Sequence, residues 1–177
     1  TPAWPAARRG GPCGPAWRSG RRSDVTTEAF WRRHRVIPVQ LLGWATASLV
    51  LAAGVAMRDP GPFAAAVALQ FAVWGAIDAG IAVAGLRGHA AKVAAGAPAS
   101  LDAGEAERRR THRLLWINAG LDVGYLAVAA ALATVGDPSA ARLGHALGVA
   151  VQGGFLLAFD AAHAAGLAAP LRRGERS

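Results

Sequence analysis

The stretch Leu114–Val135 reads LLWINAGLDVGYLAVAAALATV, and Asp122 is its only charged residue. A helix needs about 20 consecutive, mainly apolar residues to cross the hydrocarbon layer of a bilayer. Three more stretches are as long and as apolar, and they cover about residues 36–57, 63–86 and 141–169. The sequence therefore predicts an all-α fold, a bundle of four transmembrane helices.

A soluble, alanine-rich four-helix bundle is the alternative. Every helix of such a bundle would carry a polar face toward water. The four stretches hold no Lys, Arg or Glu apart from Arg142, near the start of the last one. Charged residues make up 17% of the chain, against about 25% in soluble domains. Both observations favour the membrane protein.

Apart from Arg142, the basic residues lie outside the apolar stretches. They are concentrated in every second segment that flanks or connects these stretches. Most stand before residue 36, between residues 87 and 113, or after residue 171, while the two other connections hold only Arg58 and Arg142. Basic loops stay on the cytoplasmic side of a membrane, so we expect a multi-pass, N-in/C-in protein of the inner (plasma) membrane. The net charge of +8 is then explained by the basic residues that set the orientation in the membrane and that contact anionic lipids. We expect the lipid bilayer as a partner and no nucleic acid.

Composition divides the chain into four parts. Residues 1–22 are rich in Arg, Gly and Pro, and we expect them to form a disordered basic tail. Residues 23–35 are expected to form an interfacial helix. Residues 36–171 would be the four-helix membrane domain, and residues 172–177 would be a second basic tail.

Two helix starts are visible outside the apolar stretches. Thr26 or Thr27 can cap the interfacial helix, which would place Phe30 and Trp31 at the membrane surface, where aromatic rings are favoured. Ser100 can cap a helix that runs directly into the third span. The third span is thus expected to begin well outside the membrane.

The two halves of the chain share a pattern that indicates an internal repeat. An Asp-Pro pair stands in both short turns. Gln70 precedes Asp78 by the same number of residues as Gln152 precedes Asp160. We predict two duplicated helical hairpins.

Small residues recur at every fourth position on three of the helices. In lipid, where no hydrophobic force draws helices together, such residues let helix backbones approach closely. We therefore expect tight helix contacts at Ala68, Ala72, Ala76, Gly80, Ala84, Gly120, Gly124, Gly144 and Gly148.

Three aspartates interrupt the predicted spans. Asp78, Asp122 and Asp160 each lie a similar number of residues from the cytoplasmic end of their span, roughly 12 to 14 Å deep at about 1.5 Å per residue. We expect these carboxyls to form a shared layer. Further polar candidates for this site are Asn118, Tyr125 and His163, with Gln70 and Gln152 about 12 Å further out.

This layer has three interpretations. A charge at this depth is costly and the interiors of the spans hold no Lys or Arg. At least one carboxyl should therefore be protonated at neutral pH unless a cation binds, as in a proton- or cation-binding site for transport or sensing. Four helices with short loops leave little room for a substrate path, so a conducting form would need a homo-oligomer. Alternatively the acids are interhelical glue in a structural or accessory subunit of a larger membrane complex. Thirdly, Asp160 and His163 would be ligands in a membrane-embedded metalloprotein, with the metal or any other cofactor unknown.

The strings NAGLDVGY at Asn118–Tyr125 and QGGFLLAFD at Gln152–Asp160 resemble those of an uncharacterised family of small, four-span bacterial integral membrane proteins. The resemblance covers about residues 36–169. It implies a four-helix fold in a bacterial inner membrane, and it brings no activity with it. The sequence holds no Walker loop, HExxH, GxSxG or CxxC element, so it indicates no catalytic residue.

Overall fold

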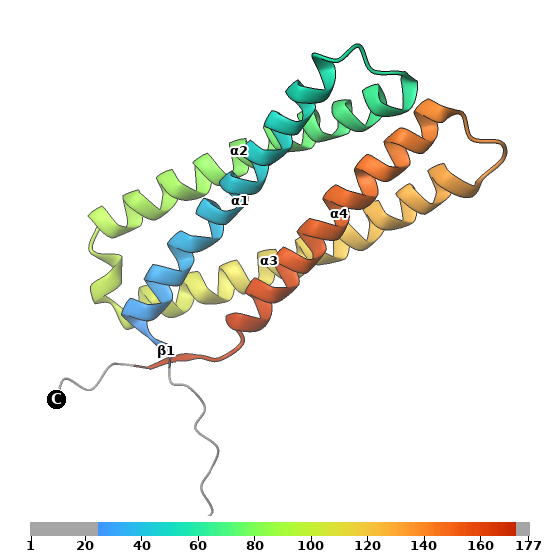
Figure 1. The fold of residues 1–177 in the computed structure, drawn as a ribbon. Helices are drawn as coiled ribbons and strands as arrows, with labels where there is room; N and C mark the ends of the chain where they lie inside the picture. Colours follow the sequence, from blue (N-terminus) through green and yellow to red (C-terminus); the bar gives the residue numbers. More distant parts are fainter. Residues whose placement is uncertain (1–24, 173–177) are drawn as a thin grey trace, which may run out of the picture.

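The computed structural model describes residues 25–172 as four long helices. These are α1 (Thr27–Ala56), α2 (Pro62–Ala94), α3 (Leu101–Thr134) and α4 (Ala140–Gly166), shown in Figure 1. All four are long and apolar enough to cross a membrane. Helices of 27 to 34 residues are about 40 to 50 Å long, more than the hydrocarbon layer of about 30 Å. The predicted all-α fold with four long, apolar helices is confirmed, and the helices extend beyond their apolar segments.

The remaining elements lie together at one end of the bundle. They are the 3-10 helix η1 (Ala97–Ala99) and two short strands, β1 (Val25–Thr26) and β2 (Leu171–Arg172), which pair in parallel. Both hairpin turns lie at the opposite end (Figure 1). We call these the basic end and the turn end. The two described chain ends therefore meet on the same side, while the side of the membrane that they face stays a prediction.

The first helix differs from the expected one. The predicted interfacial helix at residues 23–35 is not separate, because α1 runs unbroken from Thr27, capped by the hydroxyl of Thr26, through Pro38. A proline is tolerated inside a transmembrane helix, where neighbouring groups compensate for its missing hydrogen bond. The predicted tails, residues 1–22 and 172–177, lie outside the described residues apart from Arg172.

Phe30 and Trp31, which were predicted to face the membrane surface, are buried in protein. They are 0% and 5% exposed and pack with Leu115 and with the segment that follows α4. Charge pairing holds that segment in place, since Arg108 donates hydrogen bonds to the Leu167 carbonyl and to Glu105. Glu105 in turn accepts from the backbone N–H of Leu171 at 3.2 Å. The chain's own C-terminal segment therefore covers the two rings.

Helix α3 begins as predicted. The Ser100 hydroxyl accepts a hydrogen bond from the Ala103 N–H at 3.2 Å, and the helix then continues into the apolar stretch. Glu105 also pairs with Arg109, one helical turn later, at 3.3 Å.

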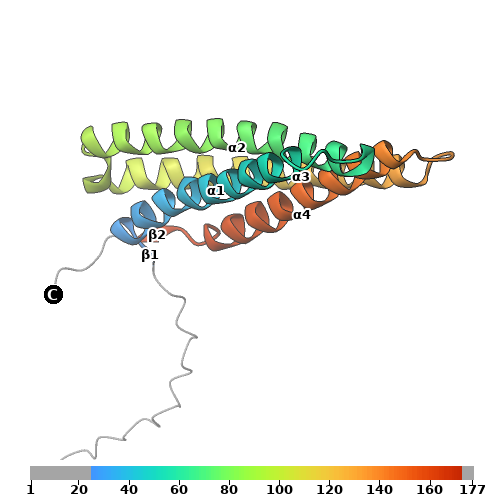
Figure 2. The ribbon, with the colours of Figure 1, turned by 45° about the horizontal axis from the view of Figure 1, so that its top comes forward.

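The two hairpins meet along one seam. Helix α1 packs along α2, α3 along α4, and α2 against α4, and side chains of α2 and α3 also meet, as in the contact of Trp74 with Tyr125. All four helices run along a common direction (Figure 2). The hairpins match the predicted architecture, and their origin by duplication stays a prediction.

Glycines allow the helices of the two hairpins to approach closely at the seam. Only some of the glycines predicted to do so lie there. A Cβ added at Gly144 would overlap the backbone carbonyl of Phe63, and one at Gly148 would overlap the side chain of Gln70. By contrast, a Cβ at Gly80, Gly120 or Gly124 would meet no atom of the described residues within 4 Å. The expectation of tight contacts is therefore wrong at these three positions, because their faces are turned away from the seam.

Candidate intramembrane acid site

The three membrane aspartates line one cavity of about 240 Å³ between the helices. Asp78 comes from α2, Asp122 from α3 and Asp160 from α4, while Leu41 of α1 completes the wall. We call this space the acid cavity. The charges of Asp78 and Asp160 both lie within electrostatic range of Asp122.

The carboxyls are buried with one side-chain hydrogen bond among them, between Asp122 and Asp160. Asp78, Asp122 and Asp160 are only 2%, 3% and 5% exposed. The Oδ2 atoms of Asp78 and Asp122 have no hydrogen-bond partner, and no salt bridge within residues 25–172 reaches any of the three. Buried polar atoms are nearly always paired in proteins. This set is therefore an exception that calls for a physical reason.

Two other predicted residues, Asn118 and Tyr125, also line the acid cavity. Aromatic rings accompany them. The Trp74 ring meets the Tyr125 ring edge to face, with centroids 4.8 Å apart, and Phe159 adds a third ring to the wall. The cavity thus combines acids with aromatic faces.

The remaining predicted residues lie elsewhere. His163 is not part of the cavity wall, since its Nε2 lies 2.9 Å from Gln40 Oε1 on α1. Asp160 and His163 therefore do not share one pocket. Within the described chain, no group of three or more His, Cys, Asp or Glu side chains is arranged to hold one metal ion. This geometry gives the metalloprotein interpretation no support.

Gln152 and Gln70 belong to a second polar layer nearer the turn end. Trp44 Nε1 donates to Gln152 Oε1 at 2.7 Å, and Gln152 Nε2 donates to Ser48 Oγ at 3.1 Å. Gln70 Nε2 lies 2.9 Å from His145 Nδ1. We call these five residues the amide layer. It ties α1 to α4 and α2 to α4 through neutral hydrogen bonds.

A polar cluster at the basic end was not predicted from the sequence. His34 Nδ1 lies 3.1 Å from His89 Nδ1, His34 Nε2 lies 3.2 Å from Glu107 Oε1, and Lys92 Nζ lies 2.5 Å from the same oxygen. Both histidines stand outside the apolar segments, and burial lowers the pKa of each. The sequence did contain a signal for this cluster, because all four residues lie in segments that were predicted to be on the same side of the membrane.

This cluster lines a cavity of about 430 Å³ between α1, α2 and α3, which we call the basic-end cavity. Leu41 and Ile81 belong to both its wall and that of the acid cavity. The two spaces therefore adjoin, one above the other along the bundle.

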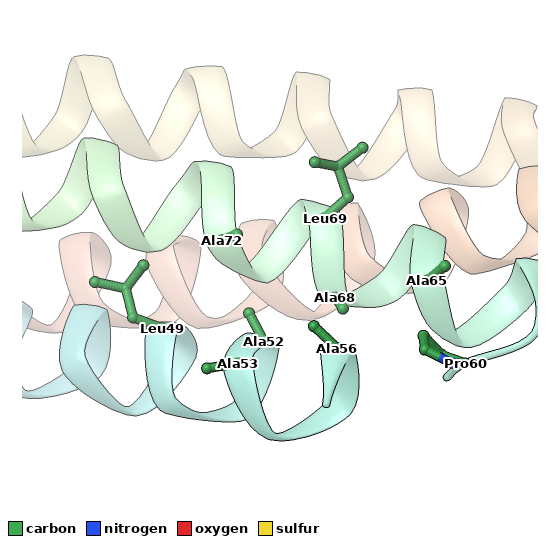
Figure 3. Close-up of a pocket in the computed structure, with 9 residues that line it drawn as sticks. All are labelled: Leu49, Ala52, Ala53, Ala56, Pro60, Ala65, Ala68, Leu69 and Ala72. Carbon is green, nitrogen blue, oxygen red and sulfur yellow. The ribbon is translucent and has the colours of Figure 1, made fainter. Parts of the chain in front are cut away.

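A third cavity, of about 500 Å³, lies between α1 and α2 toward the turn end (Figure 3). Six alanines form most of its wall, together with two leucines and Pro60. It contains no side chain able to bind or react with a polar ligand, so we assign it no chemistry.

Residues 40–161 match the model of a family described as a family of unknown function, DUF6992. No curated protein and no solved structure matches the chain.

Proposed function

The chain belongs to this family of unknown function, and we propose that it takes up protons or a cation in the acid cavity, for transport or for sensing. The observation that carries this proposal is the unpartnered state of Asp78 Oδ2 and Asp122 Oδ2. Acids that serve as interhelical glue would spend their oxygens on hydrogen bonds between helices. Here that role falls to the amide layer.

Charge balance supports the same function. Three carboxylates in a space of about 240 Å³ repel one another, and none has a basic partner among the described residues. Burying an unpaired charge within a membrane is costly. A proton or a bound cation removes this cost, so the acid cavity has a strong physical preference for a positive ligand.

Infrared spectroscopy tests the proposal. The full chain is reconstituted in lipid nanodiscs in low-salt buffer, and the protonated-carboxyl band is followed against pH. We expect a band at neutral pH that decreases when a cation is added and that Asp122→Asn diminishes. A spectrum in which all three membrane carboxyls are already ionised near pH 5 in low salt would contradict the proposal.

The orientation belongs to the same proposal. The basic residues outside the apolar segments support placing the basic end in the cytoplasm of a bacterial cell, with the protein in the inner membrane. A green fluorescent protein fused to the C-terminus should then fluoresce in a bacterial host, while alkaline phosphatase at the same place should be inactive. The reverse pair of results would overturn this orientation.

Open glycine faces favour a second candidate function, that of an accessory subunit. Gly80, Gly120 and Gly124 leave room for the helix of another protein, because the described chain places no atom within 4 Å of a Cβ there. Copurification from native membranes tests this function. A partner lost with Gly124→Leu and kept with Asp122→Asn would support it, and a chain that purifies without a partner would contradict it.

A further inference from the structure

We propose that the ligand of the acid cavity is an organic ammonium ion with apolar substituents, which reaches the cavity sideways from the bilayer between α2 and α3. This inference rests on the proposed function and names its substrate class. It draws on the cavity wall, its opening and the groups that close the other directions.

The wall suits an organic cation better than a bare ion. Trp74, Tyr125 and Phe159 line the cavity beside the acids, and aromatic faces attract ammonium groups with apolar substituents. A hard metal ion instead requires a close shell of about six or more oxygen ligands. The cavity of about 240 Å³ is also several times the roughly 30 Å³ that one water molecule occupies.

The acid cavity opens through apolar side chains. Ile77 and Ile81 of α2 and Leu121 of α3 belong to its wall and are also 47%, 57% and 55% exposed. All three lie well inside the apolar segments of α2 and α3. The opening therefore faces lipid. A hydrated inorganic ion would not cross such a surface, whereas an organic cation that partitions into the bilayer would.

The other directions are less suited to a cation. Toward the turn end, Gln152 is fully buried and bonded to Trp44 and Ser48, which closes the bundle. Toward the basic end, Lys92 and Arg110 line the adjoining cavity. Their charges outnumber that of Glu107, the only acid in that wall. Positive charge there disfavours a cation arriving from water.

The unpartnered carboxyl oxygens supply the counter-charge. Asp78 lines the cavity and is only 2% exposed. Its Oδ2 has no hydrogen-bond partner. An ammonium placed between the aromatic rings would have its charge balanced by the carboxylates of Asp78 and Asp122, which line the same cavity.

Calorimetry on the full chain in nanodiscs tests the proposal, with benzyltrimethylammonium as the probe. Its neutral carbon isostere, (2,2-dimethylpropyl)benzene, and sodium chloride are the ligand controls. We expect saturable binding of the ammonium alone. Asp122→Asn should weaken it about thirtyfold or more, the typical loss when a buried charge loses its partner. Trp74→Leu should weaken it about two- to thirtyfold.

A matched pair of variants tests the route. Leu121→Trp places a large ring in the opening, while Val123→Trp places one on a face of α3 that is equally exposed, at 55%, and outside the cavity wall. We expect the first to slow or abolish ammonium binding and the second to leave it unchanged. Equal binding by both variants would overturn the lateral route.

The outcomes separate this inference from the proposed function. Equal binding of the neutral isostere would show an apolar cavity only and overturn the ammonium assignment. No ammonium binding, together with an infrared carboxyl band that still responds to pH or sodium, would overturn the ammonium assignment and leave the proposed function standing. Carboxyls that respond to none of these ligands would overturn both.

Discussion

Gln152 of the amide layer and the acids of the acid cavity lie about two helical turns apart along the helices, and they are buried to a similar degree. Gln152 is 0% exposed and bonds both Trp44 and Ser48. Asp78 and Asp122 are 2% and 3% exposed, and each keeps one carboxyl oxygen unpartnered. A polar group buried for structure comes with its partners. The difference supports our proposal that the amides hold the helices together whereas the acids bind a ligand.

A substitution at the helix seam beside the amide layer should have the largest effect on stability. In Gly144→Ala the new methyl group overlaps the Phe63 backbone carbonyl, which cannot move without shifting α2. We expect a loss of about 1 to 3 kcal/mol or more in unfolding free energy, measured in mixed micelles. Gly124→Ala is the control, because its methyl meets no described atom within 4 Å and alanine favours a helix over glycine by about 0.5 to 1 kcal/mol. Equal losses in the two variants would contradict the described seam.

The amide layer itself should come next. Gln152→Leu leaves the Trp44 N–H without its acceptor and the Ser48 hydroxyl without its donor. We expect a loss of about 0.5 to 2 kcal/mol, as measured for hydrogen bonds between membrane helices and for buried groups left unpaired. A double-mutant cycle with Trp44→Phe measures the pairing directly. Additive effects of the two substitutions would show that this hydrogen bond does not stabilise the bundle.

Glu105 is a carboxyl with hydrogen-bond partners outside the apolar segments, and it contrasts with the acids of the acid cavity. Hydrogen bonds from Arg108 are the main cause that lowers the pKa of Glu105 from 4.5 to about 2, and the Leu171 N–H adds to them. A lowered pKa means that the pairing stabilises the folded chain above about pH 4.5 and that this stability is lost as pH falls toward 2. Glu105→Gln should therefore be less stable than the wild type at pH 7, with a difference that shrinks in acid.

The control for that titration is Asp137→Asn, which changes an exposed carboxyl in the α3–α4 turn. Its unfolding curve should follow that of the wild type across the same pH range. A pH-independent difference for Glu105→Gln would show that its pairing with Arg108 does not contribute through charge.

The acid cavity should show the smallest effect on stability. Asp122→Asn keeps an amide that can hydrogen-bond Asp160, as the carboxyl does, and it reduces the repulsion from Asp78 and Asp160. We expect its unfolding free energy to equal or slightly exceed that of the wild type, in contrast to Gln152→Leu. A loss as large as that of Gln152→Leu would restore the interpretation of the acids as glue.

The sequence alone predicts the spans and the depth of the acids well, because both depend on position along a helix axis. Leu114–Val135 overlaps α3, and Ser100 caps that helix as expected. The rise per residue then places Asp78 and Asp122 at one level, and the structure brings them to one cavity.

What the sequence predicts poorly is the direction in which each side chain points. In lipid, the outer face of a helix is as apolar as its packed face, so hydrophobicity does not tell them apart. Gly124 is therefore open where Gly144 is packed. The contacts between His34, His89 and Glu107 join residues far apart in the chain. They depend on how α1, α2 and α3 are rotated, which no local pattern records.

The most direct test of the central claim compares the infrared difference spectra that the wild type and Asp122→Asn give when a cation is added at neutral pH. If the acid cavity is a binding site, the wild type will show a protonated carboxyl converted to carboxylate, and the variant, equally stable, will show a much smaller change. Identical spectra from the two proteins would contradict the account.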